Sequence, residues 1–134
     1  MERQQLITLF NLHEAFAAAP PEAIEDLIEA GEIRHIKAGE NLLNQGATGE
    51  AIWVLLDGDL EVAVNDLPVN NITTSGEVVG EISAVSLTPA TATVRAATAV
   101  SAFCIPHGEL HRIMKSSPDF AAAMLRSMAK YLGR

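Results

Sequence analysis

Residues 80–96, GEISAVSLTPATATVRA, carry the strongest structural signal in the chain. The stretch joins a Gly-Glu pair, a short apolar segment, a Thr-Pro pair and a β-prone run. A glycine before a short helix permits close backbone approach, and the free N–H groups of a first helical turn favour an anion. We therefore interpret residues 80–91, called the cassette from here on, as an anion-binding segment. This pattern is more typical of a ligand-sensing module than of an enzyme.

Composition limits the fold and the partners. The chain has 134 residues, 49% of them apolar, which is enough for one compact domain. Nine basic and seventeen acidic residues give a net charge of −8, which disfavours direct binding to nucleic acids or anionic membranes. No apolar stretch is long enough to span a bilayer, and no signal-peptide pattern is evident. We expect a soluble, cytoplasmic, single-domain protein over residues 1–134, with its one cysteine, Cys104, buried.

Apolar residues recur at helical spacing over residues 6–28. Pro20 and Pro21 divide this pattern, so we expect two short helices within residues 1–30. In this interpretation His13 belongs to the first, amphipathic helix.

Residues 32–105 contain short β-prone runs separated by glycines. Such short, evenly spaced strands favour an antiparallel β-roll or jelly roll of about eight strands. Asp57 and Gly58 lie between two of the runs, and glycine reaches the positive φ of a tight turn, so we expect a hairpin there. The predicted fold class is α+β: a β-roll flanked by N-terminal helices, a short cassette helix at residues 82–86, and C-terminal helices.

Two C-terminal helices are predicted within residues 107–133. The helical spacing returns after Pro106, and Pro118 suits the first position of the second helix. His107 and His111 share a face of the first helix and could ligate a metal. Their spacing is not the zinc-protease order and no third ligand is evident, so the pattern favours a solvated helix start.

Short motifs follow one another in a definite order through the predicted roll and the cassette. Those of the roll are Lys37-Ala38-Gly39-Glu40, Gln45-Gly46, Gly49-Glu50, residues 53–56 and Asp57-Gly58-Asp59-Leu60-Glu61-Val62. Those around the cassette are Gly76, Gly80-Glu81-Ile82, Thr88-Pro89 and Ala92-Thr93-Val94. In this order the chain resembles, over nearly its whole length, the cyclic nucleotide-binding domains of bacterial catabolite-type regulators, cyclic-nucleotide-dependent kinases and gated channels.

The resemblance implies a site for a cyclic nucleotide, cAMP or cGMP. Such a ligand needs a carboxylate acceptor near its ribose hydroxyl, and N–H donors or a cation near its phosphate. Glu81 matches the ribose-binding glutamate of the family; the alternative is that Glu81 only places negative charge at a helix start. No catalytic residue, metal ligand or cofactor is predicted. The candidate ligand-binding residues are Gly80, Glu81, Ile82, Ser83, Ala90, Thr91 and Ala92.

Ala90 departs from the family pattern, in which the residue after the cassette proline is usually an arginine that binds the phosphate. Losing a charge-assisted contact of this kind costs about 1.5–3 kcal/mol, roughly tenfold to hundredfold in affinity. Arg95 lies five positions further on, and an odd separation along a strand places it on the opposite face unless the strand bulges. We expect an outward face of Thr91, Thr93 and Arg95 and an inward face of Ala92, Val94 and Ala96.

Two functions from different classes follow. The first is a regulatory domain that binds cAMP, cGMP or a related phosphate ligand weakly or with altered preference, and whose occupancy shifts the helix at residues 118–134. The second is a degenerate domain that binds no nucleotide and uses its C-terminal helices to contact a partner protein or a second copy. A cupin-type metalloenzyme is the rival use of a β-roll, but it needs several strand histidines and the strands offer only His35.

Overall fold

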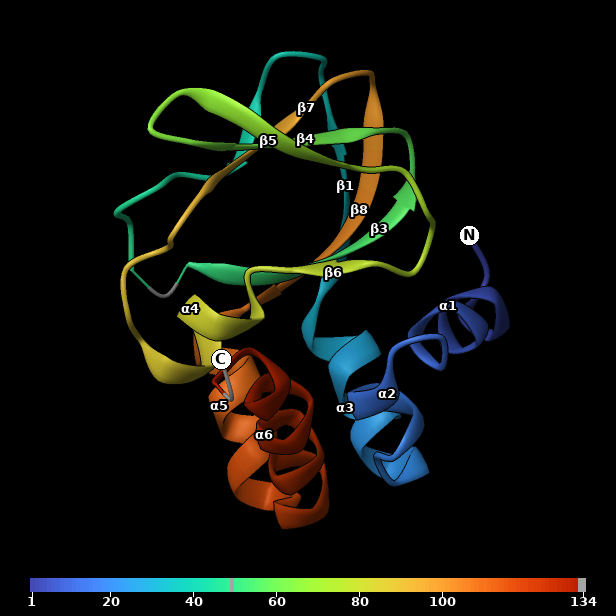
Figure 1. Ribbon diagram of the computed structural model, residues 1–134. Helices are drawn as coiled ribbons and strands as arrows, with labels where there is room; N and C mark the ends of the chain where they lie inside the picture. Colours follow the sequence, from blue (N-terminus) through green and yellow to red (C-terminus); the bar gives the residue numbers. More distant parts are fainter. Residues whose placement is uncertain (49, 133–134) are drawn as a thin grey trace.

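In the computed structural model, the described residues form two antiparallel sheets, an N-terminal and a C-terminal group of helices, and the short helix α4 between them in sequence (Figure 1). The structure describes residues 1–48 and 50–132, with side chains up to residue 129 in the last helix. Gly49 of the predicted roll motifs, and the predicted helix end at residue 133, lie outside the described residues. The helices are α1 Arg3–Phe10, α2 Glu14–Ala17, α3 Pro21–Ala30, α4 Glu81–Ser86, α5 His107–Ser116 and α6 Pro118–Leu132. The strands are β1 Glu32–Ile36, β2 Asn41–Leu43, β3 Ala51–Asp57, β4 Leu60–Val64, β5 Leu67–Ile72, β6 Val78–Val79, β7 Thr93–Ala96 and β8 Val100–Pro106.

Within the described residues the strands form two four-stranded sheets. The helix-side sheet has the order β1-β8-β3-β6, and the outer sheet has the order β2-β7-β4-β5. Figure 1 shows α1 to α3 and α5 to α6 on the same side of the helix-side sheet, with α4 next to β6. The predicted α+β class and the antiparallel β-roll are therefore confirmed, as is the start of α6 at Pro118.

The hairpin predicted at Asp57 and Gly58 is wrong. Strand β3 pairs with β8 and β6 in the helix-side sheet, whereas β4 pairs with β5 and β7 in the outer sheet. The turn at Gly58 carries the chain from one sheet to the other instead of folding it back. The hairpin lies one strand later, where Asn65 and Asp66, with φ of 52° and 67°, join β4 to β5.

The N-terminal segment holds three helices where the sequence predicted two. Helix α1 ends at Phe10, and a separate turn of helix, α2, begins at Glu14. His13 is the N-cap of α2, since its Nδ1 accepts a hydrogen bond from the Ala15 N–H at 3.2 Å. The prediction that His13 lies within a helix is therefore wrong: its side chain closes the start of one.

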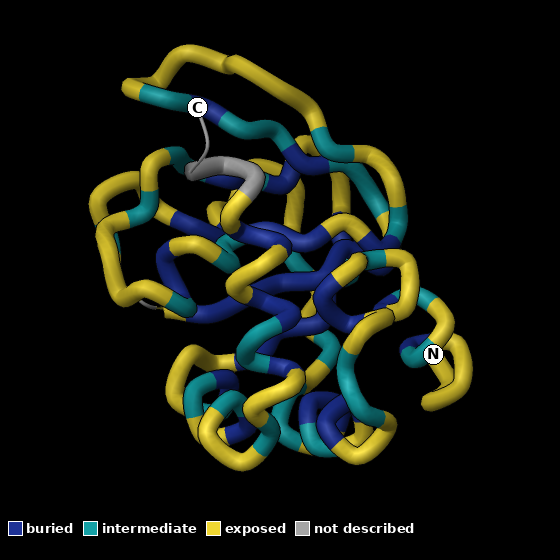
Figure 2. The backbone as a smooth tube through the Cα atoms, turned by 60° about the horizontal axis from the view of Figure 1, so that its bottom comes forward, coloured by how far each residue is buried: buried dark blue, intermediate teal, exposed yellow. Residues whose placement is uncertain are grey.

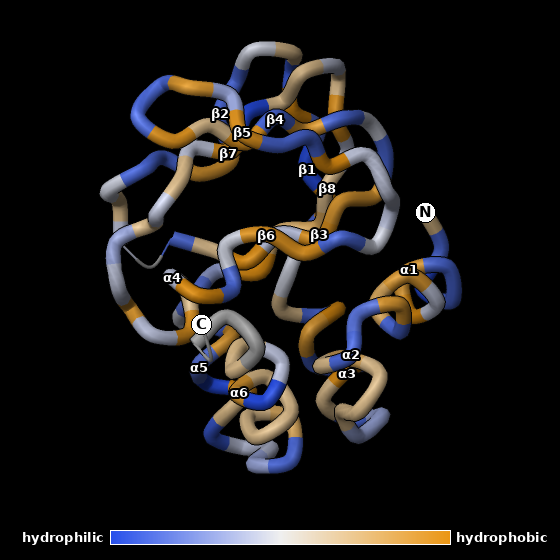
Figure 3. The backbone as a smooth tube through the Cα atoms, in the orientation of Figure 1, coloured by the Kyte–Doolittle hydropathy of each residue, from blue (hydrophilic) through white to orange (hydrophobic). Residues whose placement is uncertain are grey.

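The helices and the helix-side sheet enclose one hydrophobic core. Its aromatic centre is Phe16, whose ring lies 5.1 Å from that of Phe10 and 5.9 Å from that of Phe120. Phe103 of β8 meets Phe10 edge-on at 5.5 Å. The apolar segments of β3 and β6 lie between the helices and the outer sheet (Figure 3). Burial of these large rings joins the N-terminal helices, the sheet and α6 into one unit.

A second core fills the roll between the two sheets. It contains Trp53 and Leu55 of β3, Val94 of β7 and Cys104 of β8. The buried segments run through the middle of the molecule and the exposed ones lie toward its rim (Figure 2). Cys104 is 3% exposed, which confirms its predicted burial. Burial raises the pKa of the Cys104 thiol, so it stays protonated and poorly nucleophilic.

Candidate functional site

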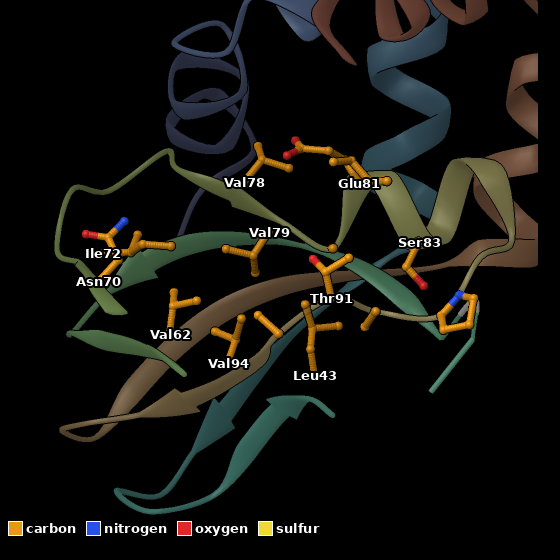
Figure 4. Close-up of a pocket in the computed structure, with 15 residues that line it drawn as sticks. Leu43, Val62, Asn70, Ile72, Val78, Val79, Glu81, Ser83, Thr91 and Val94 are labelled. Carbon is orange, nitrogen blue, oxygen red and sulfur yellow. The ribbon is translucent and has the colours of Figure 1, made fainter. Parts of the chain in front are cut away.

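A cavity of about 280 Å³ lies between α4, β6 and the inner face of the outer sheet (Figure 4). All seven residues singled out from the sequence line it: Gly80, Glu81, Ile82, Ser83, Ala90, Thr91 and Ala92. Apolar side chains that the sequence analysis did not single out form the remaining wall: Leu43, Val62, Ile72, Val78, Val79 and Val94. Asn70 of β5 adds a polar group. No local motif marks Asn70, because β5 was not recognised as a strand.

Gly80 positions the start of the cassette. It adopts a φ of +84°, and a Cβ built on it would lie 2.7 Å from the Ala51 carbonyl oxygen and 3.2 Å from Leu43 Cδ1. Any side chain at this position would therefore collide with the backbone of β3 and would strain its own backbone. Glycine lets α4 begin directly against the roll, one residue earlier than predicted, at Glu81.

The far end of the cassette is hydrogen-bonded to the loop between β2 and β3. Gly46 donates its N–H to the Ala90 carbonyl at 2.8 Å, and Ala90 donates its own N–H to the Ala47 carbonyl at 2.7 Å. Ser83 closes the cassette from within, since its hydroxyl donates to the Thr88 carbonyl at 2.6 Å. The amide of Ala90 is thus already used by the protein, whereas its side chain lines the cavity.

Donors for an anion remain at the other end of the cassette. The first bond of the helical ladder in α4 runs from the Ala84 N–H to the Gly80 carbonyl at 3.0 Å. The N–H groups of Glu81 and Ile82 precede that bond and have no acceptor within the helix. Thr91 brings a hydroxyl to the cavity wall (Figure 4). It was predicted to face outward along a strand, but β7 begins only at Thr93, so Thr91 is free of the strand alternation.

The Glu81 carboxylate turns away from the middle of the cavity. Figure 4 shows it beside Val78 on one side of β6, whereas Val79 and Thr91 lie on the other side. Its Oε2 atom lies 3.4 Å from His13 Nε2 and, among the described residues, has no hydrogen-bond partner. The carboxylate that the resemblance assigns to the ribose therefore lies against the N-terminal segment in this conformation.

The described residues that line the cavity include no arginine, lysine or histidine. Arg95 does not fill this role, because it lies on the outer face of the outer sheet as predicted. Its Nε donates to Asn41 Oδ1 at 3.2 Å, and its Nη1 lies 3.5 Å from Glu61 Oε1. Among these described lining residues, Glu81 has the one ionisable side chain.

His107 and His111 are both occupied by backbone carbonyls. His111 Nε2 lies 2.7 Å from the Ala84 carbonyl and so joins α5 to α4, and His107 Nδ1 lies 3.4 Å from the Glu50 carbonyl. In the part of the chain that the structure describes, no three His, Cys, Asp or Glu side chains are grouped to hold a metal ion. The helices of that same part are all too short or too polar to cross a membrane.

Comparison with known proteins identifies the family. A family model described as the cyclic nucleotide-binding domain matches residues 33–117, which is more than half of the chain. The chain belongs to the cyclic nucleotide-binding domain family.

Three similar proteins show the range of settings in which this domain occurs. A cyclic nucleotide-gated potassium channel of Rhizobium etli is 27% identical over 129 residues, or 96% of this chain. A cGMP-dependent protein kinase of Eimeria tenella is 38% identical over 72 residues, or 54% of this chain. The N-terminal domain of a transcriptional regulator from Streptomyces coelicolor superposes with a TM-score of 0.77 at 25% identity, covering 92% of this chain and 90% of that one. The chain spans only 35% of the length of the channel and 7% of the kinase.

Proposed function

We propose that this chain is a regulatory ligand-sensing domain, not an enzyme, that binds cAMP, cGMP or a related phosphate ligand weakly or with altered preference. The observation that carries the proposal is the cavity beside α4, where the residues of the family's ligand-binding motif meet. The cavity has an apolar wall suited to a base and a ribose, and donors at its rim suited to a phosphate.

The proposed position of the ligand follows from these groups. The phosphate lies at the start of α4, near the N–H groups of Glu81 and Ile82, with the Thr91 hydroxyl as a further donor. The base lies against the apolar wall formed by Val62, Val79 and neighbouring side chains. Because the described residues of the cavity wall include no cation, the phosphate is neutralised only in part, and affinity is low.

Occupancy is proposed to be transmitted to α6. The hydrogen bond between His111 and the Ala84 carbonyl ties α4 to α5, and α5 continues into α6 after Ser117. A ligand that binds one arrangement of α4 better than another will shift the population of these helices. Hydrogen exchange of α6 should therefore change on saturation with cAMP; unchanged exchange would remove this route of transmission.

Calorimetric titration with cAMP, cGMP and inorganic phosphate tests the proposal. We expect weak binding by the wild type and about tenfold to hundredfold tighter binding by Ala90→Arg, which restores a charge-assisted contact. Ala38→Arg, at an exposed position between β1 and β2, changes the net charge equally and serves as the matched control. The proposal fails if Ala90→Arg binds neither nucleotide, or if Ala38→Arg gains as much affinity.

The second candidate function is a domain that keeps the fold but binds no nucleotide. The lack of a cation among the described cavity residues favours it. In that case the C-terminal helices contact a partner protein or a second copy. This alternative is supported if neither the wild type nor Ala90→Arg binds a nucleotide in the titration. It also requires that the protein self-associates or captures a partner protein, and that substitution in α6 abolishes this contact.

A further inference from the structure

His13 lies beside the Glu81 carboxylate although 67 residues separate them in the sequence. The Nε2–Oε2 distance is 3.4 Å, and the two side chains are only 15% and 12% exposed. This distance is too long for a good hydrogen bond, and Oε2 has no hydrogen-bond partner among the described residues. A buried carboxylate oxygen left without a full hydrogen bond is costly, so this arrangement is readily exchanged for a better one.

The hydrogen bonds of His13 determine which of its ring nitrogens faces Glu81. Nδ1 accepts the Ala15 N–H at 3.2 Å, so it must keep its lone pair. The proton of the neutral imidazole is therefore on Nε2, the atom directed at Glu81. A neutral His13 thus caps α2 with one nitrogen and presents an N–H donor to Glu81 with the other.

The position of His13 is fixed by the packing of α2. It precedes α2, whose Phe16 is fully buried between Phe10 and Phe120. The His13 ring also lies 5.3 Å from the Phe16 ring. The imidazole therefore cannot follow Glu81 into the cavity without disturbing the packing of α2 against α6.

We propose that His13 is a positioning residue that keeps Glu81 outside the cavity, and that a bound cyclic nucleotide must take the carboxylate from it. This inference rests on the proposed function, because the competitor is the ribose hydroxyl of a ligand in that cavity. Two mutually exclusive positions of Glu81 follow, and the ligand binds only one of them. The fraction of molecules with Glu81 turned inward then scales the apparent affinity.

The exchange also couples the cavity to the N-terminal helices. When Glu81 turns inward, His13 Nε2 loses its acceptor while Nδ1 still caps α2. The N-terminal segment, packed on α6 through Phe16 and Phe120, is then held to the cassette less tightly. Ligand binding is thereby linked to α1 and α2 as well as to the C-terminal helices.

His13→Asn separates the two roles of the side chain. Asparagine can still accept the Ala15 N–H as an N-cap, but it is too short to reach Glu81. Calorimetry with cAMP, in the wild type and in the Ala90→Arg background, should give about tenfold tighter binding for His13→Asn, equivalent to about 1.4 kcal/mol. The matched control is His107→Asn, the same exchange at an exposed histidine that contacts the Glu50 carbonyl, which should leave the affinity unchanged.

Removing the Glu81 carboxylate should abolish the gain in cAMP affinity that His13→Asn produces. In the presence of Glu81→Ala, the His13→Asn substitution should no longer improve cAMP binding, because no carboxylate remains to be released. If cAMP binds Ala90→Arg but His13→Asn binds it equally or more weakly, this inference is overturned and the proposed function stands. If no protein in the series binds cAMP, both the proposed function and this inference are contradicted.

A measurement without ligand tests the contact by itself. Nitrogen NMR of the His13 ring in the free protein should show the tautomer protonated at Nε2, and Glu81→Gln should shift the Nε2 resonance more than that of Nδ1. A proton on Nδ1, or a ring indifferent to Glu81→Gln, would contradict the inference whether or not a nucleotide binds.

Discussion

The two faces of the helix-side sheet are closed in different ways. One face is covered by the helices, and its core holds the fully buried phenylalanine rings of Phe10, Phe16 and Phe120. The other face lies inside the roll, where small residues such as Ala51 and Ala102 belong to the core and a cavity opens toward α4. The helix-covered face therefore contributes most of the close packing of large side chains, whereas the roll leaves a cavity that a ligand can occupy.

The largest expected effect lies at the helix-covered face. Phe16→Ala should lower the free energy of unfolding by about 3–5 kcal/mol, because it removes the ring that joins Phe10 to Phe120. Urea unfolding followed by circular dichroism measures the loss, and Phe16→Leu should lose less. A loss below about 1 kcal/mol for Phe16→Ala would show that α2 is not part of the cooperative core.

The next effect lies at the junction of the two regions, where α4 meets β3. Gly80→Ala should cost about 2–4 kcal/mol, since it combines a strained positive φ with a collision against the Ala51 carbonyl. Gly39→Ala is the matched control: its φ is +92°, but no atom lies within 4 Å of the added Cβ. It should cost about 1–2 kcal/mol from backbone strain alone. Equal losses in the two variants would contradict the close approach.

A pair of identical substitutions compares the two faces directly. Val54 points into the helix-covered core and Val94 lines the cavity, although their exposures are 0% and 4%. Val54→Ala should cost about 2–3 kcal/mol and Val94→Ala about 1–1.5 kcal/mol, because a wall that already borders a cavity loses fewer contacts. Thermal or urea unfolding measures both. A larger loss of stability for Val94→Ala than for Val54→Ala would show that the roll, not the helix-covered core, is the more tightly packed region.

The smallest effect is expected on the outer face of the outer sheet. Arg95→Ala removes a half-exposed ion pair with Glu61 and a hydrogen bond to Asn41, and should change stability by about 0.5 kcal/mol or less. It should leave cAMP affinity in the Ala90→Arg background unchanged. A large loss of affinity would mean that Arg95 reaches the ligand after all.

Local signals in the sequence predicted the short helix after Gly80, to within one residue, and the start of α6. Gly80 requires its positive φ where the chain turns into α4, and Pro118 starts α6, so both features depend on the residue itself and its neighbours. The outward direction of Arg95 followed from strand alternation. Burial of Cys104 followed from its apolar neighbours.

Long-range partners were the part that could not be predicted. The turn at Gly58 fits a hairpin as well as a crossing between sheets, and only the pairing of β3 with the distant β8 decides between them. Strand β5 contains Pro68 and two asparagines, and as an edge strand exposed along most of its length it lacks an apolar alternation. The direction of the Glu81 side chain depends on His13, a partner that no local pattern around Glu81 announces.

The central claim is that a cyclic nucleotide binds in the cavity beside α4. Amide chemical-shift mapping of Ala90→Arg with cAMP tests it most directly, because it locates the bound ligand. The account predicts that the largest shifts at saturation occur at residues 80–84 and 90–92, with smaller ones at His13 and α6. Shifts confined to another region, such as Arg34 of β1 and Trp53 of β3, or no shifts at all at millimolar cAMP, would contradict it.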